Sequence, residues 1–172
     1  MTRRWSLAMS VLGVLAACGG TATEPLLGVW QVDAHTRNDT GCAAEGAAVA
    51  EPPFVQFQLS TVEAREVIEL VDCTAPGACA ASAGGSGRLY DDDLPTGRRA
   101  QFFTAFGDAD RCALGAFRSD AVIGADATLR IESRTYETRD LSGLRCEGRT
   151  AEQMFGSLTC RGLDVIGAHA AP

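Results

Sequence analysis

The feature that most constrains the fold of this chain is a series of short segments in which apolar and polar residues alternate. In residues 29–37, Trp30 and every second residue after it share one face, whereas His35 lies on the opposite, polar face. A period of two residues is typical of a β-strand with one buried face. Comparable runs predict seven further strands, at residues 55–60, 66–72, 88–91, 100–106, 117–123, 128–138 and 160–168.

The segments between these runs favour turns and loops. Residues 73–87, for example, are rich in Ala and Gly. One helix is predicted at residues 149–155, because Ala151 and Phe155 recur at helical spacing and Gly156 would end it. The pattern predicts a mostly β, antiparallel fold: an up-and-down barrel of about eight strands, or a β-sandwich, with one short C-terminal helix.

The N-terminus has the composition of a secretory signal peptide. Arg3 and Arg4 precede an apolar stretch at residues 5–16, and small residues follow it. The apolar stretch is shorter than the roughly 18 to 20 residues that a transmembrane helix needs. We therefore expect a signal peptide that is removed from the mature protein.

The end of this segment resembles the lipobox of bacterial lipoproteins. It reads Leu15-Ala16-Ala17-Cys18. The resemblance implies cleavage between Ala17 and Cys18, and attachment at Cys18 of a diacylglycerol and further fatty acyl chains such as palmitate. The residue after the cysteine is Gly19 rather than Asp, which by the sorting habit of that family implies the outer membrane of a Gram-negative bacterium.

The chain accordingly divides into three parts. Residues 1–17 are the expected signal peptide, residues 18–25 the lipidated cysteine with a short tether, and residues 26–172 a single β-rich domain. Removal of the signal peptide leaves 155 residues, enough for one domain with its own core.

Six further cysteines predict disulfide bonds, since an exported chain meets an oxidising compartment. They are Cys42, Cys73, Cys79, Cys112, Cys146 and Cys160. Six cysteines allow 15 pairings, and the sequence does not choose among them. Proximity in the chain favours Cys73–Cys79 and Cys146–Cys160, which leaves Cys42–Cys112. No Cys-x-x-Cys occurs and neither histidine is near a cysteine in sequence, so no zinc site is predicted.

The charge of the chain excludes one class of partner. All 15 basic residues are arginine, against 22 acidic residues, and removal of residues 1–17 changes the formal net charge from −7 to −9. A negative domain repels nucleic acid and anionic membrane surfaces. We expect contact with the membrane through the N-terminal lipid, and no nucleic-acid partner.

The start of the first predicted strand resembles that of lipocalins and related small barrels. The motif is Gly-x-Trp, formed by Gly28 and Trp30. The resemblance implies a tryptophan that closes one end of an eight-stranded barrel, with Arg161 in the last strand packing over it. The same motif is similar to the opening of small periplasmic barrels that inhibit metalloproteases through a free N-terminal segment. A lipid on the N-terminus would oppose that mechanism.

No catalytic constellation is evident. The chain has no His-Glu-x-x-His motif, and Arg88 replaces the last glycine of a Gly-x-Ser-x-Gly motif at residues 84–88. His35 and His169 are interpreted as exposed. The acidic runs at residues 91–93 and 108–110 contain oxygen ligands of the kind that calcium prefers, but they do not match an EF-hand and are interpreted as solvated turns. We expect no enzyme activity, no cofactor and no metal.

Two functions remain. The first is a lipid-anchored cell-envelope lipoprotein whose domain binds a small apolar ligand, a hypothesis based on Gly28, Trp30, the number of strands and their apolar faces. The second is a structural or protein-interaction lipoprotein, including an inhibitor-like barrel, without a small-molecule site.

Overall fold

The computed structural model describes residues 24–50, 52–81 and 88–172. Its described residues are mostly β. The long strands are β1 (Gly28–Asn38), β3 (Phe54–Val62), β4 (Arg65–Ala75), β8 (Gly97–Gly107), β9 (Cys112–Ile123), β10 (Leu129–Leu141) and β11 (Thr159–Ala170). The short ones are β2 (Ala47–Ala48), β5 (Ala78–Cys79), β6 (Leu89–Tyr90) and β7 (Asp92–Leu94). All eight predicted strands are present, and β2, β5 and β7 are additional.

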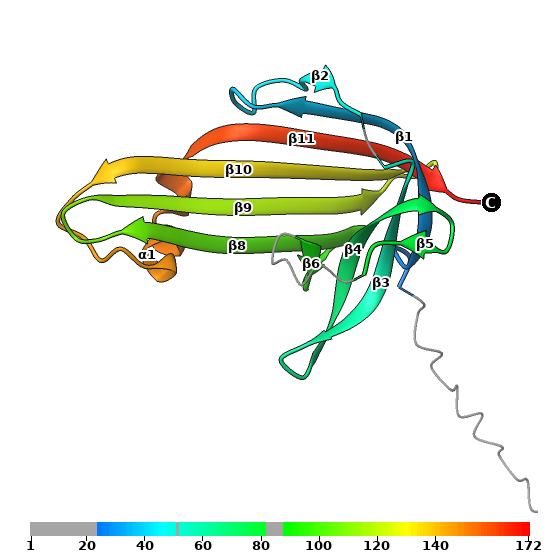
Figure 1. The fold of residues 1–172 in the computed structure, drawn as a ribbon, viewed down its shortest axis with the longest axis horizontal. Helices are drawn as coiled ribbons and strands as arrows, with labels where there is room; N and C mark the ends of the chain where they lie inside the picture. Colours follow the sequence, from blue (N-terminus) through cyan, green and yellow to red (C-terminus); the bar gives the residue numbers. More distant parts are fainter. Residues whose placement is uncertain (1–23, 51, 82–87) are drawn as a thin grey trace, which may run out of the picture.

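The strands form one antiparallel sheet in the order β5-β4-β3-β1-β11-β10-β9-β8-β7, with β2 paired to β1 and β6 paired to β4 (Figure 1). The first and last long strands are neighbours, as in an up-and-down barrel. The expectation of a closed eight-stranded barrel is nevertheless wrong, because the sheet does not close. Residues 89–94 supply only a two-residue strand to the edge of β4 and a three-residue strand to the edge of β8, so no ladder joins β4 directly to β8.

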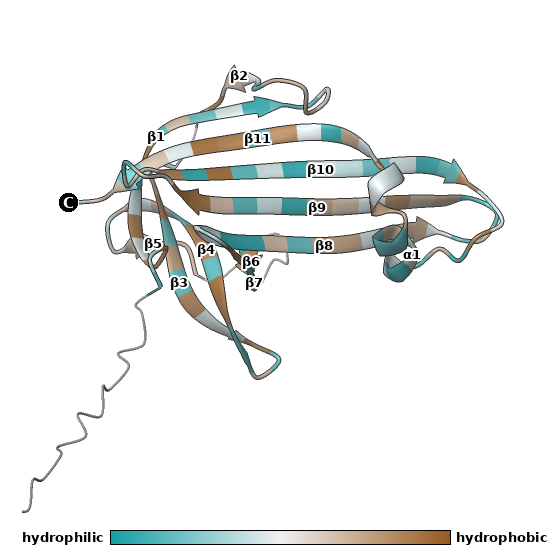
Figure 2. Cartoon of the chain, turned by 180° about the vertical axis from the view of Figure 1, so that it is seen from behind, coloured by the Kyte–Doolittle hydropathy of each residue, from teal (hydrophilic) through white to brown (hydrophobic). Residues whose placement is uncertain are grey.

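The two faces of the long strands have different covers. On one face, β3, β4 and β6 lie across β8–β11 near the end where the C-terminus lies (Figure 1). On the opposite face, α1 (Gly148–Gln153) and the 3-10 turn η2 (Phe155–Ser157) pack over the far ends of β8, β9 and β10 (Figure 2). We call the face covered by β3, β4 and β6 the inner face, and the face covered by α1 and η2 the outer face. The helix predicted at residues 149–155 is confirmed, since α1 and η2 occupy this segment. No helix in residues 24–50, 52–81 or 88–172 is long and apolar enough to cross a membrane.

The main core fills the space between the inner face and β3–β4. Trp30 is 6% exposed and lies in this cluster with Phe57 and Leu129. Its indole Nε1 donates a hydrogen bond of 3.0 Å to the carbonyl oxygen of Leu26, which is fully buried. Trp30 is therefore a core residue at this end of the inner space.

Glu24, the first described residue, is held at the same end. Its Oε2 accepts hydrogen bonds from Nε and Nη2 of Arg98, at 3.0 and 2.8 Å. With Leu26 buried two residues later, the chain is fixed to the domain from Glu24 onward. The arginine expected to cover Trp30 does not do so: Arg161 is exposed near the start of β11, whereas Trp30 pairs with Ala170 near the end of that strand.

A β-bulge in β1 changes which residues face inward. Val32 pairs with Ala168 but Ala34 pairs with Gly167, so Asp33 is an extra residue. An extra residue reverses the alternation beyond it. Trp30 and Val32 face inward before the bulge, and His35 faces inward after it. The prediction that His35 lies on the solvent face is wrong for this reason, since it assumed an unbroken period of two.

The cysteines form three disulfides, Cys42–Cys160, Cys73–Cys79 and Cys112–Cys146. The predicted local pair Cys73–Cys79 is confirmed, and the other two predicted pairs are wrong. The cause is the topology: β1 and β11 are neighbours in the sheet, which brings Cys42, after β1, to Cys160 in β11. Cys146 precedes α1, which packs on β9 and so returns to Cys112.

Candidate functional site

The inner face contains a cavity of about 470 Å³ next to the main core. It lies between β4 and β6 on one side and β1, β8, β9, β10 and β11 on the other. Leu70, Ile131 and Ile166 form its apolar base, where it borders the core cluster. Most of the remaining lining residues are aromatic or polar, and they come from several strands.

The wall formed by β1 and β11 contains three charged or titratable side chains. His35 Nε2 contacts Oδ1 of Asp164, and the Asp164 Oδ2 accepts a hydrogen bond of 2.8 Å from Nε of Arg37. Arg37 and Asp164 are direct cross-strand partners, and His35 pairs with Ile166. The bulge at Asp33 therefore places His35 and Arg37 on the cavity, and the antiparallel register supplies the carboxylate between them.

The opposite wall contains a second arginine and aspartate. Arg88 Nη1 and Nη2 donate hydrogen bonds of 2.7 and 3.0 Å to the two carboxylate oxygens of Asp72. Such a two-point geometry fixes both side chains more firmly than a single contact. Arg88 precedes β6 and Asp72 lies in β4, so this pair also ties the short strand to its neighbour.

A chain of hydroxyl groups crosses the back of the cavity. The hydroxyl of Tyr90 lies 2.7 Å from Oγ of Ser119, which lies 2.7 Å from Oγ of Ser133. Tyr90 and Ser133 line the cavity, and Ser119 is fully buried beneath them. Burial raises the pKa of Tyr90 from its ordinary value of 10.0 to about 12.

An aromatic pair forms the side of the cavity toward the far ends of the long strands. The rings of Phe102 in β8 and Phe117 in β9 are stacked, with centroids 5.3 Å apart and planes 25° apart. The two residues are direct cross-strand partners on the inner face. Since α1 packs on the outer face, both rings are available to the cavity.

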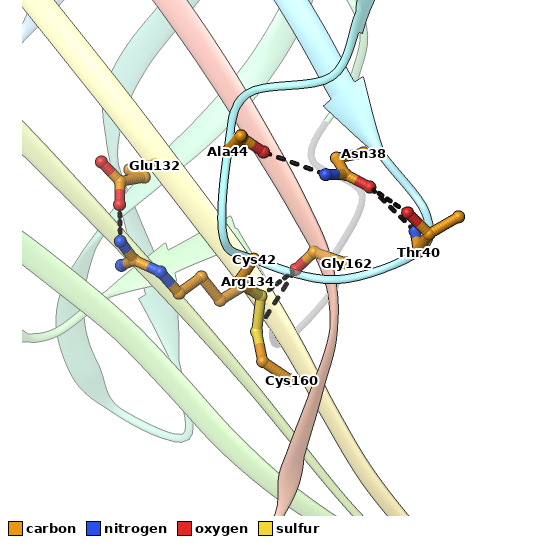
Figure 3. The surroundings of a disulfide bond; sticks show 8 residues. All are labelled: Asn38, Thr40, Cys42, Ala44, Glu132, Arg134, Cys160 and Gly162. Atoms are coloured by element: carbon orange, nitrogen blue, oxygen red, sulfur yellow. Dashed lines mark hydrogen bonds and ion pairs between the residues drawn. A yellow bond between two sulfur atoms is a disulfide. The ribbon is translucent and has the colours of Figure 1, made fainter.

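The loop that follows β1 forms part of the rim and is cross-linked to β11 (Figure 3). Asn38 Oδ1 accepts hydrogen bonds from the backbone nitrogen and the hydroxyl of Thr40, at 2.9 and 2.8 Å, and its Nδ2 donates to the Ala44 carbonyl at 3.0 Å. The disulfide Cys42–Cys160 holds this loop beside the sheet. Asp39, within the loop, contributes a carboxylate to the rim.

Most of the residues predicted from the sequence lie away from the cavity. Gly28 and Trp30 lie at the start of β1, and Ala17 and Cys18 lie outside the described residues. His169 is half-exposed and its Nδ1 lies 2.8 Å from Asp33 Oδ1. His35 is the exception, because it lines the cavity, although it was interpreted as exposed.

The acidic runs are engaged in local contacts. Asp93 pairs with Arg98 at 2.6 Å, and Asp108 accepts hydrogen bonds from backbone nitrogens two and three residues later. In the part of the chain that the structure describes, no group of three or more His, Cys, Asp or Glu side chains is arranged to hold a metal ion.

The cavity combines an apolar base with polar and charged side chains that converge from several strands. This is the usual composition of a small-molecule site, in which apolar contact supplies affinity and fixed polar groups orient the ligand. The single signal for it in the sequence was the alternation that gives each strand an apolar face. The chain matches no protein-family model, no curated protein and no solved structure.

Proposed function

We propose that this protein is a lipid-anchored lipoprotein of the cell envelope whose domain binds a small, largely apolar ligand in the cavity on the inner face of its sheet. The observation that carries the proposal is the cavity itself. Its volume of about 470 Å³ falls within the range of roughly 300 to 1,000 Å³ typical of ligand sites.

The arrangement of the cavity supports ligand binding over a purely structural role. Leu70, Ile131 and Ile166 give it an apolar base, and Phe102 and Phe117 an aromatic side. A fully packed interior would leave no room for a ligand on this face. The first and last long strands are neighbours, as in the up-and-down barrels that the Gly28-x-Trp30 motif resembles, but here the sheet is open and the cavity lies on its inner face.

The lipobox at residues 15–18 supports the anchor. Two or more acyl chains on Cys18 would hold the protein stably in a bilayer. We propose the outer membrane as its location, on the basis of Gly19.

A displacement assay tests the binding function. The probe is N-phenyl-1-naphthylamine, a neutral apolar dye whose fluorescence rises in an apolar site, added to the Cys18→Ser protein so that lipid does not interfere. Thr135 is an exposed residue at the rim, so Thr135→Trp should fill the cavity entrance and reduce the fluorescence rise at least fivefold. Thr61→Trp, at another exposed strand threonine that does not line the cavity, is the matched control. Equal dye binding by both variants would place the dye elsewhere and count against the proposal.

A second candidate function is protein interaction at the envelope. It is favoured by Phe106, which is 69% exposed on the inner face beyond the cavity. Phenylalanine is among the aromatic residues enriched at the core of protein interfaces. Cross-linking in intact envelopes tests it: a partner recovered with the native chain and lost with Phe106→Ser would favour this function, and identical recovery would oppose it.

A further inference from the structure

We infer that the ligand of this cavity carries a positively charged head, an amine or quaternary ammonium group, on its apolar body. The inference rests on the proposed function and adds the chemical class of the ligand. It follows from the charges that line the cavity, from the aromatic rings beside them and from the net charge of the domain.

Both arginines that line the cavity are matched by carboxylates. Arg37 Nε lies 2.8 Å from Asp164 Oδ2, and Arg88 donates to both oxygens of Asp72 at 2.7 and 3.0 Å. A guanidinium already opposed by a carboxylate at this distance attracts an added anion weakly, because the two fields largely cancel beyond the pair. An anionic head, such as a fatty-acid carboxylate, would have to compete with Asp164 or Asp72.

The rim contains one more carboxylate than guanidinium groups. Asp39 joins Asp72 and Asp164 against Arg37 and Arg88. Among the carboxylates and guanidinium groups of the lining, the negative charges therefore outnumber the positive charges by one. A cation at the rim would be attracted to this excess without breaking either existing pair.

Three aromatic rings line the same space. Phe102 and Phe117 are stacked on each other, and Tyr90 lies at the back of the cavity. The faces of aromatic rings attract cations, and sites for quaternary ammonium groups are commonly built from them. The rings and the carboxylates thus favour the same ligand charge for independent reasons.

The field of the whole protein acts in the same direction. The formal net charge is −7 for the full chain. A net negative domain raises the local concentration of cations and speeds their association, and this effect falls as salt screens it.

Three probes that share one ten-carbon chain test the inference: decylammonium, decanol and decanoate. Each displaces N-phenyl-1-naphthylamine from the Cys18→Ser protein at pH 7 and low ionic strength. We expect half-displacement by decylammonium at a concentration at least tenfold below that of decanoate, with decanol between them. Decanoate binding as well as or better than decylammonium would overturn the inference, and so would equal binding of all three.

The two proposals fail in distinguishable ways. If neither the dye nor decanol binds, the ligand-binding function itself is wrong. If decanol binds but decylammonium has no advantage over it, only the charge inference is wrong.

A matched pair of variants separates a local from a distant effect of charge. Asp39→Asn removes a carboxylate from the rim and should reduce the preference for decylammonium over decanoate at least threefold. Glu63→Gln makes the same change in net charge at an exposed turn remote from the cavity, and should change the preference by less than half as much. Equal effects of the two variants would show that the rim does not recognise the charge, and would overturn the inference.

Discussion

The hydroxyl of Tyr90 lies 2.7 Å from Oγ of Ser119, and this contact joins the short strand β6 to the buried middle of β9. Tyr90 pairs in the sheet with Ile68 of β4. The Tyr90–Ser119 contact therefore ties the β4 edge of the sheet, through β6, to β9, the neighbour of β8 near the opposite edge. It is also the back of the cavity, so the stability of the fold and the shape of the site depend on the same two side chains.

Ser119→Ala should destabilise the protein by about 1 to 3 kcal/mol, because it leaves the buried hydroxyl of Tyr90 without that partner. Urea denaturation followed by circular dichroism measures the change. Ser133→Ala is the control, since Ser133 is half-buried on the cavity and water can replace it; its cost should be under 1 kcal/mol. A larger cost for Ser133→Ala than for Ser119→Ala would contradict the assigned roles.

Trp30→Ala should cost about 3 to 5 kcal/mol, the usual penalty for truncating a buried aromatic side chain. Trp30→Phe keeps most of the buried area but loses the hydrogen bond to the Leu26 carbonyl, and should cost about 1 to 2 kcal/mol. Both values come from denaturant midpoints read by circular dichroism. A near-neutral Trp30→Ala would mean that Trp30 is not a core residue.

The disulfides should contribute unequally. Cys42–Cys160 closes a separation of 118 residues and Cys73–Cys79 a separation of six. Loop-closure entropy in the unfolded chain predicts a loss of about 5 kcal/mol when both Cys42 and Cys160 become Ala, against about 2 kcal/mol when both Cys73 and Cys79 do. Thermal and urea unfolding under oxidising conditions compare the two double variants. Equal losses would show that the unfolded-state constraint is not the main term.

Low pH should lower the free energy of unfolding, in part because Asp120 becomes protonated. Burial alone would raise the pKa of this carboxyl, but hydrogen bonds from Arg99 and Arg118 lower it below the ordinary value of 3.8. A lowered pKa contributes stability that is fully present above pH 3.8 and is lost as the pH falls through the folded-state value. The difference in unfolding free energy between the native protein and Asp120→Asn should therefore be constant between pH 7 and 5 and shrink below pH 4.

Replacement of both arginines tests the cause of this acid sensitivity. With Arg99→Gln and Arg118→Gln together, burial is unopposed and raises the pKa of Asp120, so the stability of the Asp120 protein relative to Asp120→Asn should grow rather than shrink as the pH falls. If the shrinkage below pH 4 persists without the arginines, their hydrogen bonds are not its source.

Cys18→Ser should leave the protein without lipid and free of the membrane. Intact mass spectrometry and fractionation of the envelope measure both properties. The native chain should be heavier by the acyl groups and should release six thiols only on reduction. A Cys18→Ser protein that still sediments with membranes would contradict the lipobox interpretation.

The strands and the helix could be predicted because their signals are local. A period of two residues, or of three to four, reports which face of an element is buried without reference to the rest of the chain. The eight expected strands and the helix near Ala151 all follow from such patterns. The short pairings β2, β5 and β7 did not, since two or three residues have no period.

The site was not predictable in the same way, because it depends on partners far apart in sequence. His35 could not be assigned to the cavity while the bulge at Asp33 was unknown, and nothing in the residue types there indicates a bulge. Cys42 and Cys160 pair because the first and last strands are neighbours. Ser119 and Ser133 are ordinary serines until the register of β9 and β10 places them together.

The fixation of Glu24 by Arg98 has a consequence for how a ligand reaches the cavity. If Cys18 is acylated as proposed, residues 18–23 would connect the bilayer to the domain, and six residues span at most about 20 Å. The Glu24–Arg98 contact lies at the same end of the domain as Trp30. From there β10 rises about 20 Å, from Leu129 in the core to Thr135 at the rim of the cavity. Ligand exchange would then take place through the aqueous compartment beyond the membrane rather than by lateral entry from the lipid, so the off-rate into water would limit how long a ligand is retained.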